Sequence, residues 1–226
     1  DYDFGKYAKA TASQVGCCGR AWLFDEQARR FIAAHPDAVV VQIGAGLDAR
    51  YERLGRPPIT VWYDLDLPDV IALRRELLPE AGNIYLGDSL FATDWMARAA
   101  AHGKPVLLLC EGVLMYFEEN EVRAWLATLA QHLPQAELVF DIIPTILVGR
   151  AKRHDALGSM DKPPPEMKWS VRDSRELEHW LPGLVLENES PLSKTCGYRY
   201  PLFLRLLYSL GIGSKLDQRI VRVKLP

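Results

Sequence analysis

The sequence predicts an α/β protein whose doubly wound, mostly parallel sheet carries antiparallel strands at its C-terminal edge. Short apolar runs alternate with helical patterns between residues 38 and 144. The first run, residues 39–43, is β-branched and continuous, which is typical of a strand buried on both faces. The alternation stops after Pro144. Strand–helix alternation at this pitch requires right-handed crossovers, and these build a parallel sheet.

The core elements follow one another in a regular order. Strands are expected at residues 39–43, 59–63, 83–86, 105–110 and 136–143. A helix is expected to begin near Pro68, because proline suits the first helical turn, and to carry Val70, Leu73 and Leu77 on one face. A second helix is expected around residues 95–101. A third should span 118–132, with its acidic start at the positive end of the helix dipole and with Val122, Trp125, Leu126 and Leu129 buried.

The remaining segments complete a single domain over residues 1–226. Residues 1–37 are expected to form an N-terminal helical segment, 38–144 a cofactor-binding βα core, 145–217 a lid and substrate region, and 218–226 a final strand. The lid region holds a basic helical stretch at 148–154, the prolines 163–165 as a rigid strap, and a capped helix at 173–176. It also holds a late strand at 184–187 and an apolar helix at 200–210. We expect the strands at 184–187 and 218–223 to add to the sheet edge in antiparallel orientation.

Composition excludes several classes of protein. The 27 basic and 29 acidic residues give a formal charge of −2, which argues against binding to a nucleic-acid backbone. No apolar run approaches the roughly 20 residues that span a bilayer. The four cysteines show no metal-ligand spacing, so we expect free thiols in the cytoplasm and no zinc site. The chain starts without Met and without a basic-then-apolar signal segment, so further residues are expected upstream.

Small and acidic residues follow the predicted strands, where an open parallel sheet binds its ligands. They are the turn Gly44-Ala45-Gly46, then Asp64, Asp66 and Leu67, then Gly87-Asp88-Ser89, and then Glu111-Gly112. The carboxylates at 66, 88 and 111 lie 22 and 23 residues apart, one βα unit each, so they should meet at one edge. Carboxylates gathered in this way need donors or cations as partners. S-adenosylmethionine, with its ribose hydroxyls, adenine amino group and cationic tail, supplies them.

A nicotinamide dinucleotide is the competing ligand. The turn fits the pattern Gly-x-Gly-x-x-Ala, and Asp64 stands 20 residues after Gly44 as the dinucleotide fingerprint requires. However, the turn runs into the charged segment 48–53, and further carboxylates would repel a pyrophosphate. No Tyr-x-x-x-Lys pair follows the first strand. The residues therefore favour the methyl donor, with an NAD(P)-binding oxidoreductase as the alternative.

Three segments carry a resemblance to a known family. They are VVVQIGAGLDARYERL, WYDLDLPDVIALRRELLP and CEGVLMYFEENEV. Together they resemble the leucine carboxyl methyltransferase family, and its bacterial branch of tetracenomycin polyketide-synthesis methyltransferases most of all. The resemblance implies a Rossmann-like class I methyltransferase fold and an S-adenosylmethionine-dependent O-methyltransferase. It also implies a preceding segment with a further cofactor or substrate contact.

The family's motif roles carry over residue by residue as implications of this resemblance. Gly44 and Gly46 would form the turn against the methionine portion, and Asp66 would hold the ribose hydroxyls. Asp88 and Ser89 would lie at the adenine. Glu111 would face the amino-acid end of the donor, and Arg20, 24 residues before Gly44, would grip the donor's carboxylate. A bidentate arginine–carboxylate pair suits that last role. Arg50 either binds the ligand or pairs with Asp48.

The acceptor is expected to be a small polyketide-like or other secondary-metabolite acid. A carboxylate with a pKa near 4 is already ionised at neutral pH, so its methylation needs no general base, whereas a phenol would need one. No catalytic residue is singled out, because the lone His154 and His179 are typical of surface positions. Trp22, Tyr116, Trp169, Tyr198 and Tyr200 either line an acceptor pocket or belong to the core. A non-catalytic S-adenosylmethionine-binding domain is a further alternative, and the chain is expected to be a monomer or a homodimer.

Overall fold

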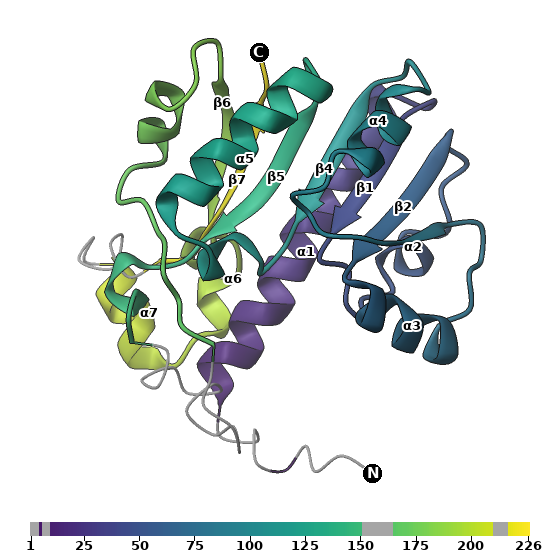
Figure 1. Ribbon diagram of the computed structural model, residues 1–226. Helices are drawn as coiled ribbons and strands as arrows, with labels where there is room; N and C mark the ends of the chain where they lie inside the picture. Colours follow the sequence, from purple (N-terminus) through teal and green to yellow (C-terminus); the bar gives the residue numbers. More distant parts are fainter. Residues whose placement is uncertain (1–4, 6–9, 151–164, 210–216) are drawn as a thin grey trace.

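A computed structural model describes residue 5 and residues 10–150, 165–209 and 217–226 of the chain. Its centre is a seven-stranded sheet with the strand order β3-β2-β1-β4-β5-β7-β6 (Figure 1). The strands are β1 (Val39–Ile43), β2 (Val61–Asp66), β3 (Ile84–Gly87), β4 (Val106–Cys110), β5 (Glu137–Ile142), β6 (Val185–Pro191) and β7 (Arg219–Lys224).

Strands β1 to β5 run parallel, and the two late strands run antiparallel. Val39 of β1 pairs with Val61 of β2 and with Val106 of β4, which places β1 at the point where the strand order reverses. Glu137 of β5 pairs with Lys224 of β7, and Val185 of β6 pairs with the same Lys224. The predicted fold class is confirmed, including the antiparallel addition at the C-terminal edge.

Helices cover both faces of the sheet. The α-helices of the described residues are α1 (Thr11–Ala34), α2 (Arg50–Arg53), α3 (Pro68–Leu77), α4 (Asp94–Ala100), α5 (Glu119–His132), α6 (Leu192–Cys196) and α7 (Leu202–Ser209). On one face α4 and α5 pack on the side chains of Val39, Val41 and Ile43. On the other face α1 and α6 pack against Val40 (Figure 1). Burial on both faces explains why the first strand is continuously apolar.

Several predicted elements need correction. In α3 the buried residues are Ile71 and Arg74, whereas Leu73 and Leu77 are exposed, because the buried arginine replaces an apolar residue in the pattern. Strand β2 continues to Asp66, so Asp64 lies inside it and not after it. The late strand is longer than expected, at Val185–Pro191. The capped helix at 173–176 is a 3-10 helix, Ser174–His179, in which Asp173 and Glu176 form the capping box.

Two further predicted helices are present in the structure. Helix α5 buries Val122, Trp125, Leu126 and Leu129 as expected. The apolar helix of the lid region spans Leu202–Ser209. Parts of three predicted segments lie outside the described residues: 151–154 of the basic stretch, which includes His154, the first two prolines of the strap, and residue 210.

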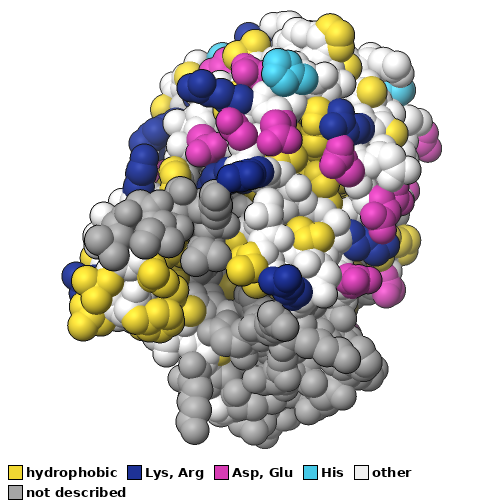
Figure 2. Space-filling view, turned by 90° about the vertical axis from the view of Figure 1, so that its left-hand side faces the viewer, with side chains coloured by type: hydrophobic (Ala, Val, Ile, Leu, Met, Phe, Trp, Pro, Cys, Tyr) yellow, Lys and Arg dark blue, Asp and Glu magenta, His cyan; other side chains and the backbone are white. Residues whose placement is uncertain are grey.

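The surface carries charges of both signs. On the face turned toward the viewer in Figure 2, acidic and basic side chains are interspersed, and hydrophobic side chains gather at the height of α7. Leu202, Phe203 and Leu206 of α7 are each more than half exposed. Among the described helices, none is long and apolar enough to cross a membrane.

Candidate functional site

The turn after β1 is built from glycines that hold backbone angles unfavourable for other residues. Gly44 has a φ of 67° and Gly46 a φ of 50°. The backbone N–H groups of Gly44 and Ala45 donate to the Leu65 carbonyl at 2.8 and 3.1 Å, which ties the turn to β2. A Cβ on Gly44 would lie 2.4 Å from Cγ2 of Val113, whereas a Cβ on Gly46 would meet nothing within 4 Å. The turn is therefore packed tightly at Gly44 and is open above Gly46.

Arg74 supports this turn from below. Its buried guanidinium donates to the carbonyls of Gly46 at 2.9 Å and of Asp48 at 2.8 Å, and to Oδ2 of Asp64 at 3.1 Å. Asp64 also accepts from Trp62 and Asn83 and is fully buried, and this burial raises the pKa of its carboxyl despite these partners. The structure thus places Asp64 beneath the turn with internal partners, away from the open rim where the sequence predicted it.

Asp66 and Asp88 lie on the rim itself. Asp66 accepts the N–H of Gly46 through Oδ2 and the N–H of Leu67 through Oδ1, both at 2.7 Å. The N–H of Asp88, next after Gly87 of β3, donates to the Asp66 carbonyl at 2.9 Å, and Oδ1 of Asp88 accepts the N–H of Ser89 at 2.7 Å. Both carboxylates remain partly exposed. The sheet edge therefore brings these two acidic residues together, as the spacing predicted.

Three apolar side chains that are close to these carboxylates in sequence, or to the glycine turn, are exposed. Leu47 is 48% exposed, Leu67 52% and Phe91 41%. An apolar surface interrupted by carboxylates suits the base and ribose of a nucleoside.

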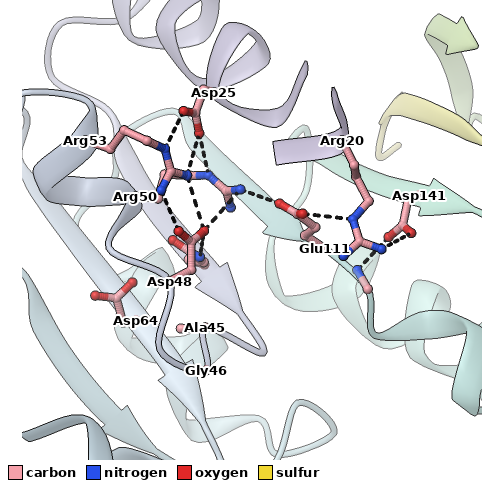
Figure 3. A network of polar contacts seen from close by, with 12 residues as sticks. Arg20, Asp25, Ala45, Gly46, Asp48, Arg50, Arg53, Asp64, Glu111 and Asp141 are labelled. Atoms are coloured by element: carbon pink, nitrogen blue, oxygen red, sulfur yellow. Dashed lines mark hydrogen bonds and ion pairs between the residues drawn. The ribbon is translucent and has the colours of Figure 1, made fainter. Parts of the chain in front are cut away.

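Glu111, directly after β4, is held by two arginines from opposite sides (Figure 3). Its Oε1 accepts from Nε of Arg20 at 2.8 Å, and its Oε2 accepts from Nη2 of Arg50. Arg20 comes from the middle of α1, and Arg50 opens the short helix α2. The carboxylate is thus fixed in place between α1 and the glycine turn.

Asp141, near the end of β5, is the second carboxylate that binds Arg20. Its Oδ2 accepts from Nη1 of Arg20 at 3.2 Å and from Gln218 at 2.7 Å, and its Oδ1 accepts the N–H of Gly112 at 2.6 Å. Burial opposes the charge on Arg20, but Asp141 and Glu111 together raise the pKa of its guanidinium above the usual value. Gly112 has a φ of 71°, and a Cβ there would lie 3.1 Å from Nη2 of Arg20. The guanidinium therefore rests directly on the backbone after β4.

Arg50 lies behind Glu111 and is fully buried. Its Nε donates to Asp25 at 2.9 Å, and its Nη2 lies 3.2 Å from Asp48. Arg53 joins the same cluster through Asp25 and Asp48. Nη1 of Arg50 is buried without a hydrogen-bond partner among the described residues. The pairing with Asp48 is observed, and it occurs together with pairing to Asp25 and Glu111.

Most of the predicted residues meet at one edge. Those that the structure places at the carboxyl ends of β1 to β4, or against these ends, are Arg20, Gly44, Ala45, Gly46, Arg50, Asp66, Leu67, Gly87, Asp88, Ser89, Glu111 and Gly112. The sequence analysis missed Asp25, Arg74 and Asp141. Of these, Asp141 had a readable signal, because it stands near the end of a predicted strand as Asp66 does.

Tyr116 and Cys110 lie near Asp141, whereas the described histidines lie elsewhere. Burial raises the pKa of the Tyr116 phenol and of the Cys110 thiol. The four described histidines precede strands: His35 comes before β1, His102 before β4, His132 before β5 and His179 before β6. Because the start of β6 is in register with the start of β5, all four lie toward the opposite end of the strands.

The five aromatic candidates for an acceptor pocket differ in exposure, and Tyr116 and Tyr200 are half-buried. Trp169 is buried in the core, packed near Phe140. Trp22 and Tyr198 are more than half exposed and line a cavity of about 450 Å³ between α1 and α6. Within the described ranges, no group of three or more His, Cys, Asp or Glu side chains could hold a metal ion.

The geometry fits a methyl donor better than a dinucleotide. A pyrophosphate binds at the start of a substantial helix, but α2, which follows the glycine turn, has only four residues. The rim instead offers partly exposed carboxylates for hydroxyl and amino groups and an arginine for a carboxylate. The open space above Gly46 leaves room for a ligand against the backbone.

Known proteins are similar to this chain in sequence. An O-methyltransferase of tetracenomycin polyketide synthesis from Streptomyces glaucescens is 34% identical over 84% of this chain and 69% of its own length. An S-adenosyl-L-methionine-dependent methyltransferase from Gibberella zeae is 30% identical over 87% of this chain and 72% of its own. The fold and these relatives define a class I S-adenosylmethionine-dependent methyltransferase. Residues 3–130 match the leucine carboxyl methyltransferase family, and the chain belongs to that family.

Solved structures agree on the fold. A DUF574 family protein from Streptomyces avermitilis superposes with a TM-score of 0.59 at 18% identity, over 94% of this chain and 83% of its own. The N-methyltransferase NodS from Bradyrhizobium japonicum superposes with a TM-score of 0.53 at 13% identity, over 89% of this chain and 94% of its own. At such identities the likeness concerns the fold alone.

Proposed function

We propose that this methyltransferase transfers a methyl group to a carboxylate oxygen of a small organic acid. The observation that carries the proposal is that none of the described histidines lies at this edge, and that the carboxylates there already accept hydrogen bonds from the chain. Burial raises the pKa of the Tyr116 phenol, and the described histidines lie toward the other end of the strands. An acceptor that is already ionised needs no proton removed. The O-methyltransferase among the relatives and the name of the family support oxygen as the acceptor atom.

Each part of the methyl donor would be bound by different residues of the chain. Asp66 would accept the ribose hydroxyls, and Asp88 with Ser89 would contact the adenine, next to the exposed Leu67. Glu111 would accept from the ammonium group, and Arg20 would hold the carboxylate. Two hydrogen-bonded carboxylates already position Arg20, so the guanidinium is oriented before any ligand arrives.

The charge around Arg20 favours a cation. Three arginines and four carboxylates form the network of Figure 3 that spans Arg20, Asp25, Asp48, Arg50, Arg53, Glu111 and Asp141, which leaves a formal charge of −1. S-adenosylmethionine supplies a methyl group on a positively charged sulfur. The chain contributes alignment and the exclusion of water, so that the carboxylate oxygen forms the new C–O bond as the C–S bond breaks.

A base-stability assay on the product tests the proposal. The enzyme is incubated with S-adenosylmethionine labelled in its methyl group and with pairs of aromatic acceptors that carry either a carboxylate or a phenol on the same ring system. Mild alkali hydrolyses methyl esters to methanol but leaves methyl ethers intact. We expect label only in the acids and its release as volatile methanol. Label that resists alkali would overturn the carboxylate proposal in favour of a hydroxyl acceptor. Donor binding without any transfer would favour a non-catalytic domain.

A further inference from the structure

The position of Glu111 depends on Arg50, a buried residue that lies behind it and away from the open rim. Both of its carboxylate oxygens are engaged by arginines, Oε1 by Arg20 and Oε2 by Arg50. Arg20 is partly exposed at the site, but the side chain of Arg50 is fully buried. The orientation of Glu111 therefore depends on what fixes Arg50 behind it.

Asp25 of α1 supplies that anchor. Its side chain is only 6% exposed and accepts three hydrogen bonds from two arginines. Oδ1 accepts from Nε of Arg50 at 2.9 Å and from Nη2 of Arg53 at 3.0 Å, and Oδ2 accepts from Nε of Arg53 at 2.7 Å. Hydrogen bonds between charged partners are short and directional, so they fix the plane of a guanidinium.

Apart from Asp25, the guanidinium of Arg50 has few polar partners among the described residues. Nη2 is shared between Glu111 and Asp48, and Nη1 has no partner among the described residues. The guanidinium lies 5.3 Å from the centre of the Phe24 ring. Nε is thus engaged by Asp25 alone, and loss of that contact would free the guanidinium to turn toward Asp48 or Glu111. Either movement displaces the carboxylate of Glu111.

We propose that Asp25 is a positioning residue for the donor site, acting on Glu111 through Arg50. The inference rests on the proposed role of Glu111 at the ammonium group of the donor. Asp25 belongs to the same helix as Arg20, five positions later, so α1 fixes both oxygens of Glu111: one directly and one by way of Arg50. Asp25 itself contacts only arginines in these interactions and does not touch the ligand.

A double-mutant cycle with S-adenosylhomocysteine as the probe tests this inference. Affinity is measured by calorimetry for the unsubstituted chain, for Asp25→Asn, for Glu111→Gln and for the double variant. Glu26→Gln is the matched control, because Glu26 is the next residue of α1 and pairs with Arg29 at the surface. We expect Asp25→Asn to weaken binding at least about tenfold, since hydrogen bonds to charged groups are worth that much. Glu26→Gln should stay within about twofold.

The cycle separates positioning from general stability. If Asp25 acts through Glu111, Asp25→Asn should change affinity by less than about twofold once Glu111 is already glutamine. An equal loss of affinity in both backgrounds would overturn the inference, and so would unchanged binding in Asp25→Asn. Should Asp25→Asn fail to fold, Asp25→Glu replaces it in the same cycle, because it keeps the charge while moving the carboxylate by one methylene. Failure of the unsubstituted chain to bind the probe would overturn the donor site itself, which is a distinguishable result.

Discussion

Replacement of Arg20 by lysine is expected to weaken donor binding while leaving the fold intact. The arginine uses two of its three nitrogens for contacts with the described residues. Nε donates to Glu111 at 2.8 Å, Nη1 donates to Asp141 at 3.2 Å, and Nη2 donates to none of the described residues. Lysine keeps the charge but offers one nitrogen, so it cannot pair with both carboxylates and a ligand in this geometry.

The magnitude follows from the contact that is lost. One hydrogen bond between a guanidinium and the donor's carboxylate is worth about 1.5–3 kcal/mol, which corresponds to a roughly 10- to 150-fold increase in Kd. Calorimetric titration with S-adenosylhomocysteine measures this change. Arg29→Lys is the control, because Arg29 lies on the same helix, is exposed and pairs only with Glu26 among the described residues. Similar Kd values for the two variants would refute the assignment of Arg20 to the donor's carboxylate.

Three further predictions concern the turn, the acidic cluster and the backbone under Arg20. Gly44→Ala should destabilise the fold by about 2–5 kcal/mol, because it combines a left-handed backbone with a contact at 2.4 Å, whereas Gly103→Ala, with similar φ but open space, should cost about 1–2 kcal/mol; equal falls in Tm would contradict this. Burial raises the pKa of Asp48, but its pairing with Arg53 and Arg50 outweighs that effect and lowers the pKa below its usual value. The ionised Asp48 therefore stabilises the fold above about pH 4, and this stability is lost as the pH falls through the lowered pKa. Below about pH 4 the Tm of the unsubstituted chain should fall more steeply than the Tm of Asp48→Asn. Parallel curves of Tm against pH would show that the pairing adds no stability. Gly112→Ala should weaken S-adenosylhomocysteine binding because its Cβ would lie 3.1 Å from Nη2 of Arg20, whereas Gly197→Ala, where the nearest contact is an ordinary 3.7 Å, should leave binding unchanged; a comparable Kd for both would contradict that reasoning.

The sheet and the carboxylate rim could be predicted because their signals are local. A continuously apolar strand such as residues 39–43 indicates burial on both faces, and one βα unit separates each acidic residue from the next. Parallel strands place such residues at the same edge whatever the helices do. Asp66, Asp88 and Glu111 therefore follow from chain order alone.

The polar support beneath the rim could not be predicted in the same way. Arg74 is buried because it reaches the carbonyls of the glycine turn, about 28 residues earlier in the chain. A periodicity argument treats such an arginine as solvent-facing, and so it assigned the wrong face to α3. Asp64 and Asp66 share a face of β2, and the donors that surround Asp64, Arg74 among them, distinguish the buried carboxylate from the partly exposed one.

Among the described residues, no side chain caps the start of helix α1, and its first turn holds no acidic residue. Side-chain contacts fix the middle of the helix, where Arg20 bonds to Glu111 directly and Asp25 reaches Glu111 by way of Arg50. A ligand that engages Arg20 and Glu111 would slow amide hydrogen exchange along α1. Protection of this helix would then report the occupancy of the donor site without any catalytic turnover.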